Sequence, residues 1–136
     1  LEHVAGYSIL VDGSVRDYQK HSVTAGKNFD ASSSYGPWIV TADEVPDWTK
    51  LVLTTRLNGQ TMQHSAFGML IWSVPFVINY VSRVTKLMPG DAISTGTPAG
   101  VGHRRTPQLF MKAGDVLEVE VAGIGTLRNT IVDEST

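Results

Sequence analysis

The sequence predicts an α+β domain that is mostly β structure with one main helix. Residues 116–121 alternate between apolar and acidic side chains over most of their length, as expected of a strand with one face toward solvent. Asn58-Gly59 separates two strand-like segments and is typical of a tight β-hairpin. Residues 73–85 form the clearest segment whose apolar side chains follow the helical period.

The first third of the chain is expected to alternate between strands and loops. Residues 4–11 are mostly apolar and rich in β-forming side chains, which predicts a buried strand. Asp12-Gly13-Ser14 predicts a turn, and residues 15–19 are compatible with one helical turn. Small polar side chains dominate residues 21–36, which favours a loop before a short strand at 37–41.

The hairpin and the helix occupy the middle of the chain. Residues 51–57 and 60–64 are the expected arms of the hairpin, because Asn-Gly tolerates the two positive φ angles of a type I′ turn. Ser73 is placed to cap the helix that follows, and Pro75 is tolerated in its first turn.

The last third is expected to contain strands separated by glycine-rich turns. Residues 92–95 predict a short strand, and residues 96–102 predict a glycine- and proline-rich loop. Residues 112–115 predict a turn into the alternating strand at 116–121. A final strand is expected at 126–132, after the glycines at 123 and 125.

The composition predicts a single folded domain that spans residues 1–136. Of the 136 residues, 42% are hydrophobic, which is enough for a core. The formal net charge of −2 offers no basic excess for a phosphate backbone, so nucleic acid is not an expected partner. Without cysteine, the chain cannot form disulfides, Fe–S clusters or cysteine-ligated zinc sites. The most apolar run, 67–81, is shorter than the roughly 20 residues that span a bilayer, so we expect a soluble protein with no membrane partner. A cytoplasmic location is expected, because it fits the absence of cysteine.

Asp12 is the first candidate for chemistry. It follows a predicted buried strand, where a charge needs a cation or several hydrogen bonds. Arg16 can serve as that cation, and so can a hard divalent metal ion. The alternative is a turn-forming aspartate beside a solvated Arg16–Asp17 pair, and spacing alone favours this alternative.

Lys27 and residues 94–102 are further candidates for binding an anion. Lys27 is either solvated or presents a cation to an anionic substrate. In residues 94–102, backbone N–H groups and threonine hydroxyls can bind a carboxylate or phosphate, although a tight structural turn explains the pattern equally well.

Neither a P-loop ending nor a Gly-x-Ser-x-Gly elbow is present, so nucleotide binding and serine hydrolase chemistry are not predicted. The four histidines show no metal-binding spacing, and His21 and His103 lie in loops from which they can reach a pocket.

Several segments follow one another in an informative order. They are Gly6-Tyr7, Asp12, Ser14, Arg16-Asp17, Gln19, and residues 26–30, 36–46, 58–59, 87–91, 95–102 and 114–129. Together they resemble the C-terminal part of the fumarylacetoacetate hydrolase family. The pattern of that family includes N-D-x-S-x-R-D-x-Q, K-S-F-D, G-P-W-I-V-T-x-D-E-I-P and T-G-T-P-x-G-V-G, in this order. The resemblance covers nearly the whole chain.

The resemblance implies the mixed β-sandwich roll of that family and roles for five residues. It identifies Asp12 as a ligand of a divalent metal ion, either Mg²⁺ or Mn²⁺, with Ca²⁺ as a further option. It identifies Arg16, Gln19 and Lys27 as catalytic side chains that contact the keto and carboxylate oxygens of the substrate. Thr95 is implied to bind the substrate carboxylate, together with Gln19 and Lys27.

The resemblance also implies an enzyme that acts on a 2-oxo acid of the acylpyruvate type. The implied reactions are C–C hydrolysis, keto–enol isomerisation and decarboxylation, all through a metal-stabilised enolate. Degradation of aromatic compounds is the implied context, and a homodimer is the implied assembly. A small-molecule 2-oxo acid is therefore the expected partner.

The chain departs from the family pattern in ways that leave two hypotheses. Val11 stands where the family has Asn, Asn28 stands where it has Ser, and Gly13 and Val15 are expected to loosen their segment. The Glu-x-Glu metal strand and the His–Glu pair of the family are expected upstream of residue 1, so the first strands of the domain are expected to be missing. One carboxylate does not satisfy the octahedral coordination of a hard cation. The chain is then either part of a complete enzyme, or a catalytically incompetent fragment or relict that keeps the fold for dimerisation or small-ligand binding.

Overall fold

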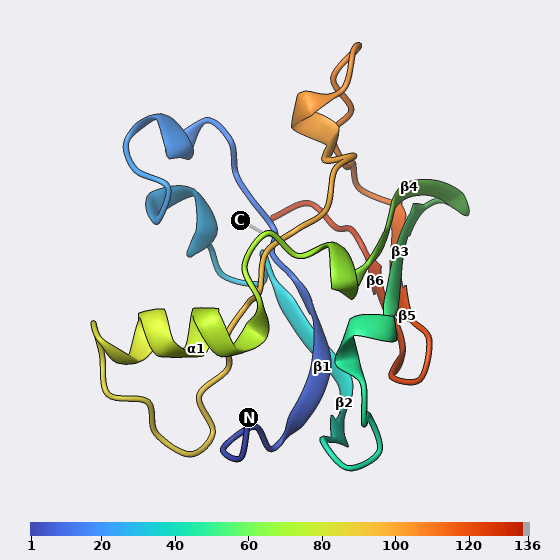
Figure 1. Ribbon diagram of the computed structural model, residues 1–136. Coiled ribbons are helices and arrows are strands. Elements are labelled where there is room, and N and C mark those ends of the chain that lie inside the picture. Colours follow the sequence, from blue (N-terminus) through green and yellow to red (C-terminus); the bar gives the residue numbers. More distant parts are fainter. Residues whose placement is uncertain (135–136) are drawn as a thin grey trace.

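Six strands form two antiparallel sheets in the computed structural model, which describes residues 1–134 (Figure 1). β1 (Gly6–Val11) pairs with β2 (Ser34–Thr41) in a two-stranded sheet. The second sheet has the strand order β4-β3-β5-β6, with bounds β3 (Val52–Leu57), β4 (Gln60–Ala66), β5 (Val116–Val121) and β6 (Gly125–Thr130).

Helical structure is confined to one α-helix and several single turns in the described residues. The helix is α1 (Val74–Ser82). The 3₁₀ turns are η1 (Tyr18–Lys20), η2 (Ala25–Lys27), η3 (Trp48–Lys50), η4 (Phe67–Met69) and η5 (Gly102–Arg104). The expected mostly β fold with one main helix is therefore confirmed.

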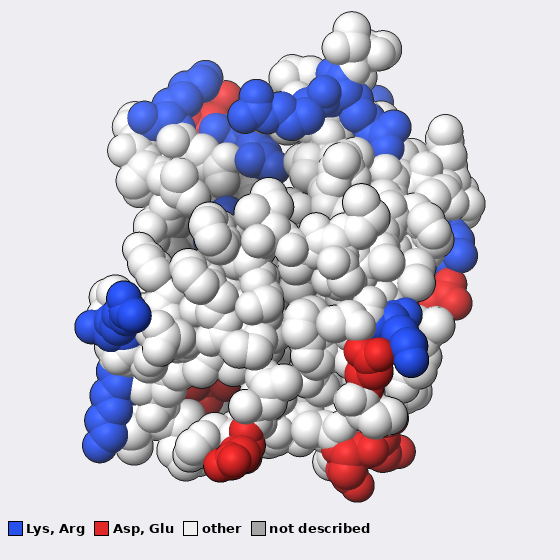
Figure 2. All heavy atoms as spheres, in the orientation of Figure 1, with Lys and Arg blue, Asp and Glu red and all other residues white. Residues whose placement is uncertain are grey.

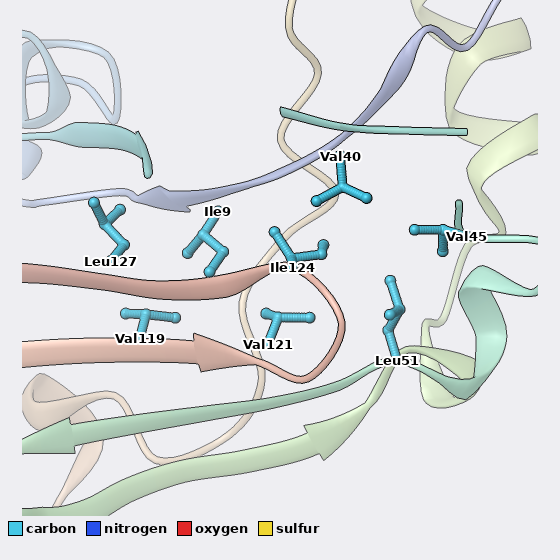
Figure 3. Packing of buried hydrophobic residues seen from close by; sticks show 8 residues of the cluster. All are labelled: Ile9, Val40, Val45, Leu51, Val119, Val121, Ile124 and Leu127. Atoms are coloured by element: carbon cyan, nitrogen blue, oxygen red, sulfur yellow. The ribbon is translucent and has the colours of Figure 1, made fainter. Parts of the chain in front are cut away.

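The hydrophobic core lies where the two sheets face each other (Figure 3). β5 buries Val119 and Val121, whereas Glu120 between them stays partly exposed, as the alternating sequence predicts. Burying one such aliphatic side chain stabilises the fold by about 1.5–3 kcal/mol. The full cluster consists of Ile9, Val40, Val45, Leu51, Val119, Val121, Ile124 and Leu127.

The hairpin turn between β3 and β4 is also tied to the start of β5. Asn58 and Gly59 have φ angles of 50° and 79°, which confirms the type I′ turn expected from the sequence. The Asn58 side chain donates from Nδ2 to Asp115 Oδ1 at 2.8 Å and accepts from the Val116 N–H at 2.8 Å. Asp115 Oδ2 in turn accepts from the Lys112 N–H at 2.8 Å. The turn residue therefore anchors the hairpin to the neighbouring strand.

The helix begins and ends close to its expected bounds. Ser73 Oγ accepts from the Phe76 N–H at 3.4 Å, so the expected N-cap is confirmed, and Pro75 lies in the first turn. The indole of Trp72 stacks on the ring of Phe76 with 4.6 Å between centroids. Within residues 1–134, no helix is both long enough and apolar enough to cross a membrane.

The strand expected at residues 92–95 is absent from the structure, which makes that prediction wrong. The residues belong to a segment without regular secondary structure that joins α1 to β5. An apolar stretch favours extended backbone, but a strand also needs a neighbouring backbone to pair with. In the described part of the chain these residues pair with no strand.

Replacing Asn58 tests the dual role of the turn. Asn58→Ala loses the side-chain hydrogen bonds and also places a Cβ-bearing residue with little preference for positive φ in the turn. Asn58→Gly loses the same hydrogen bonds but accepts the backbone conformation. We expect both variants to unfold at lower denaturant concentration, and Asn58→Ala to be less stable than Asn58→Gly by roughly 1 kcal/mol. Equal stabilities in urea titrations would contradict the proposed backbone constraint.

Asp115 is expected to make the stability depend on acid pH. Hydrogen bonds from the Asn58 side chain and from the Lys112 N–H hold the pKa of Asp115 below its ordinary value. A lowered folded-state pKa contributes stability above the unfolded pKa of about 3.9, and this stability is lost as the pH falls through the folded pKa. The stability difference between the wild type and Asp115→Asn should therefore shrink between pH 7 and pH 2.5 in urea titrations. The exposed control Asp133→Asn should show no such pH-dependent difference.

Candidate active site

A cleft of about 350 Å³ opens between the four-stranded sheet and two long segments of the chain. Its floor is mostly apolar and comes from β3 and β5, with Leu53, Thr55, Leu57, Leu117 and Val119 among its residues. Its rim is polar. One wall follows β1 and carries Asp12, Ser14, Arg16 and Lys27, and the other carries Ser94, Thr97, His103 and Arg105. The two walls lie at the same end of the molecule, in blue and orange at the top of Figure 1.

Close backbone packing builds the first wall. A Cβ on Gly13 would overlap the carbonyl oxygen of Ser32, and a Cβ on Gly26 would overlap the Gln19 side chain. The Val15 N–H donates to the Gly26 carbonyl at 2.9 Å. The segment after β1 therefore packs directly on η2 and brings Lys27 beside it. The expectation that Gly13 loosens this segment is wrong, because the missing side chain is what allows the close approach.

Asp12 and Lys27 form an ion pair at the mouth of the cleft. Lys27 Nζ contacts Asp12 Oδ2 and also donates to Ser14 Oγ at 3.3 Å. The two charged side chains keep 42% and 31% of their surface exposed, so the pair adds at most about 1 kcal/mol to stability. Asp12 Oδ1 has no hydrogen-bond partner among the residues that the structure describes. The pair thus leaves one carboxylate oxygen and one ammonium hydrogen available to a ligand.

Arg16 and Gln19 have different positions in this wall. Arg16 lines the cleft and donates from Nη1 to Gln19 Oε1 at 2.8 Å. Gln19 does not line the cleft, and its Cγ lies against Gly26. Gln19 therefore orients Arg16, whose remaining guanidinium hydrogens are available for an anion. Whether Gln19 also contacts substrate stays a prediction.

The second wall is held against the edge strand β4. Gly100 has a φ angle of +106°, and a Cβ there would overlap the carbonyl oxygen of Met62. Gln63 Nε2 donates to Thr97 Oγ1 at 3.0 Å and to the Pro98 carbonyl at 2.8 Å. This contact fixes the loop that contains the Thr-Gly-Thr-Pro sequence.

Arg105 ties the same loop to the same strand. Its Nε donates to the Gly100 carbonyl at 3.0 Å, and its Nη2 donates to the Met62 carbonyl at 2.6 Å. Met62 is the residue of β4 that is skipped in the pairing with β3, so its carbonyl is available to Arg105. Neither Arg105 nor Gln63 is among the residues that the sequence analysis singled out. Arg105 bonds to Met62, 43 positions away, and Gln63 bonds to Thr97 and Pro98, 34 and 35 positions away. No local sequence pattern indicates such contacts.

Thr95 lies beside the cleft, between Ser94 and Gly96, which line it. Thr95 is half-buried and is not itself a lining residue. Its expected contact with a substrate carboxylate stays a prediction. Of the two loop histidines, His103 lines the cleft and His21 does not.

Positive charge gathers at the end of the molecule where the cleft walls lie. Lys and Arg side chains form a band along the top of Figure 2, whereas most of the Asp and Glu side chains visible on this face lie lower. The segments at this end contribute Arg16, Lys20, Lys27, Arg104 and Arg105. These five cationic side chains stand against three carboxylates of the same segments, Asp12, Asp17 and Asp30, so cations outnumber carboxylates here in a chain whose formal net charge is −2.

The described residues can provide part of the ligand set of a metal ion. Asp12 is the only carboxylate among the cleft-lining residues, and residues 1–134 hold no cluster of three or more His, Cys, Asp or Glu that is arranged to bind a metal ion. Mg²⁺ and Mn²⁺ prefer six-coordinate oxygen environments. Asp12 can supply one such ligand through its unpartnered oxygen, and a full site needs others.

Comparison with known proteins identifies the family. Residues 1–132 match the family model described as fumarylacetoacetate (FAA) hydrolase C-terminal. The chain belongs to the fumarylacetoacetate hydrolase family. Among family members, a 2,4-didehydro-3-deoxy-L-rhamnonate hydrolase of Sphingomonas sp. is 42% identical over 96% of this chain and 47% of its own length. A mitochondrial oxaloacetate tautomerase of Bos taurus is 38% identical over 97% of this chain and 43% of its own.

Solved structures of the fumarylacetoacetate hydrolase family share the fold. A fumarylacetoacetate hydrolase from Exiguobacterium antarcticum matches 98% of this chain and 48% of its own, with a TM-score of 0.93 and 41% identity. A maleylpyruvate hydrolase from Sphingobium sp. SYK-6, in complex with manganese(II) and pyruvate, matches 94% of this chain and 44% of its own, with a TM-score of 0.82 and 33% identity. This chain spans about half the length of the relatives that it matches.

Replacing Arg105 tests how the second wall is held. Arg105→Ala removes two charge-assisted hydrogen bonds, so residues 94–102 should detach from β4 more often. We expect thermolysin, which cleaves before apolar residues such as Val101, to cut this loop about tenfold faster. The neighbouring exposed residue provides the control, and Arg104→Ala should leave the cleavage rate unchanged. Equal rates for both variants, measured by mass spectrometry of the fragments, would contradict the role given to Arg105.

Proposed function

We propose that this chain is the C-terminal part of a divalent-metal-dependent enzyme that acts on a 2-oxo acid of the acylpyruvate type. The observation that carries the proposal is the Asp12–Lys27 pair, which lies beside Arg16 at the mouth of a cleft with an apolar floor. The two cations at this rim, Lys27 and Arg16, can bind the oxygens of an anionic substrate, and the carboxylate of Asp12 can bind a metal ion that holds the same substrate. Family membership supports the same reading.

Asp12 would contribute one ligand to the metal ion, and the remaining ligands would come from residues outside those described. When bound, such a metal ion would supply Lewis-acid polarisation of the substrate carbonyl. The manganese- and pyruvate-bound relative supports Mn²⁺ or Mg²⁺ as the type of ion and a 2-oxo acid as the type of ligand.

The other residues of the first wall would bind and orient the substrate. Lys27 is held by Asp12 and Ser14, so its ammonium group has a fixed place from which to offset negative charge on the substrate oxygens. Arg16 is held by Gln19 and presents its other N–H groups to a carboxylate. Thr95 would bind the substrate carboxylate from the opposite wall.

The reaction that the proposal supports is formation of an enol or enolate at the 2-oxo acid. This step is shared by C–C hydrolysis, keto–enol isomerisation and decarboxylation. The relatives include both hydrolases and a tautomerase, and the residues described here serve all of these reactions. Within this range we favour a hydrolase or isomerase of aromatic-compound catabolism. The homodimer and the cytoplasmic location expected from the sequence stay predictions.

The alternative is a relict that keeps the fold without catalysis. The incomplete carboxylate set in the described residues is the observation that favours it. Turnover of the full-length protein separates the two hypotheses, because a relict would show no metal-dependent turnover with any 2-oxo acid.

Single substitutions in the full-length protein test the enzymatic proposal. The assay uses acylpyruvates, oxaloacetate and 2-hydroxyhepta-2,4-diene-1,7-dioate with Mg²⁺ or Mn²⁺. Asp12→Asn should lower kcat/KM by about 100-fold or more and weaken metal binding, and Lys27→Met should cause a similar loss in kcat/KM because a positioned charge is removed.

Exposed residues of the same types provide matched controls. Asp133→Asn and Lys86→Met change the same charges outside the cleft and should leave the kinetic constants unchanged. Near-normal activity of Asp12→Asn at low metal concentration would contradict the proposal and make Asp12 a turn residue.

A further inference from the structure

A second recess adjoins the cleft, with a volume of about 550 Å³. Four residues, Ser14, Arg16, His103 and Phe110, line both the cleft and this recess. The recess is therefore an extension of the cleft between the same two walls. A ligand whose one end lies beside Lys27 can reach into it.

The hydrogen bonding of His103 determines which ring nitrogen carries a proton. Gln108 Nε2 lies 2.9 Å from the His103 carbonyl oxygen and 3.2 Å from His103 Nδ1. The amide nitrogen is a donor, so Nδ1 is the acceptor and the neutral imidazole carries its hydrogen on Nε2. Within the described residues this Nε2–H has no partner. The ring is half-buried beside Phe110, with 6.2 Å between the two ring centroids.

The charges around the recess favour an anion. Asp17 also lines the recess, but Lys20 Nζ lies 3.0 Å from its Oδ1 and offsets its charge. Arg16 has no carboxylate partner among the described residues. The recess therefore has a net positive charge and two groups with available donors, the Arg16 guanidinium and the His103 Nε2–H.

We propose that this recess is a second subsite that binds the distal carboxylate of a dicarboxylic 2-oxo acid. His103 is its specificity-determining residue, because its Nε2–H donates to the distal carboxylate. Arg16 lies between the two subsites and contributes charge to both. The inference rests on the proposed function, since it assigns the 2-oxo acid end of the same ligand to the Asp12–Lys27 region.

Two ligands of equal chain length test the subsite in the full-length protein with Mn²⁺. 2-Oxoadipate ends in a carboxylate, and 2-oxohexanoate ends in a methyl group. Calorimetry gives the dissociation constant of each ligand without requiring turnover. We expect the wild type to bind 2-oxoadipate roughly tenfold to 100-fold more tightly, as expected for hydrogen bonds to a charged group.

Three histidine variants isolate the role of Nε2–H. His103→Phe keeps an aromatic ring beside Phe110 but lacks the donor, so the preference for 2-oxoadipate should fall about tenfold. His103→Gln places an amide N–H near the position of Nε2 and should retain most of the preference. His21→Phe makes the same change at a histidine outside both cavities and should retain all of it. Unchanged binding of 2-oxohexanoate shows that each variant keeps an intact cleft.

The outcomes separate the subsite from the proposed function. Equal binding of the two ligands by the wild type, or an unchanged preference in His103→Phe, overturns the subsite even if Asp12-dependent turnover is found. Tight, His103-dependent binding of 2-oxoadipate without turnover of any 2-oxo acid supports the subsite and overturns the enzymatic proposal. Absence of binding by both ligands overturns both.

Discussion

Apolar contact between the two sheets determines where the functional residues lie. The β1–β2 sheet has only two strands, and pairing alone does not hold such a sheet. Burial of Ile9 and Val40 against Val119 and Val121 supplies the missing stability (Figure 3). Because β1 is fixed in this way, its end at Val11 delivers Asp12 to the mouth of the cleft. The side of β5 that supports the core thus also supports the site.

Contacts between irregular segments then complete the site. Because Gly13 and Gly26 have no side chain, the segments of the first wall pack closely against each other. Because Gly100 has no side chain, the second wall can approach β4. Polar side chains, above all Arg105 and Gln63, occupy the backbone carbonyls that these segments leave unpaired. A rigid sheet and two docked loops are a common arrangement for a binding site, because the sheet positions loops that carry the chemistry.

Local features of the fold could be predicted from the sequence, and long-range contacts could not. The Asn58-Gly59 turn and the Ser73 cap depend on residues within a few positions of one another, and both were confirmed. The prediction of a strand at 92–95 was wrong, because a strand forms only where a distant segment supplies a backbone to pair with.

The candidate site follows the same division. Spacing alone left Asp12 and Lys27 as separate, undecided candidates, since they are 15 positions apart and no local pattern indicates the ion pair that the fold creates. The order of several motifs brought them together through the family resemblance. The role of Arg105 was not predicted because its hydrogen bond to Met62 spans 43 positions. His103 was left as a loop histidine whose partner, Gln108, no motif indicated.

The position of Met62 has a consequence for how the protein avoids unwanted association. β4 is an edge strand of the four-stranded sheet, and exposed edges can recruit a strand from another molecule. The irregular pairing at Met62 interrupts the edge, and Arg105 occupies the carbonyl that would accept an incoming N–H. The loop that forms one wall of the cleft therefore also covers part of an aggregation-prone edge, so selection for a well-ordered site and selection against aggregation act on the same few hydrogen bonds.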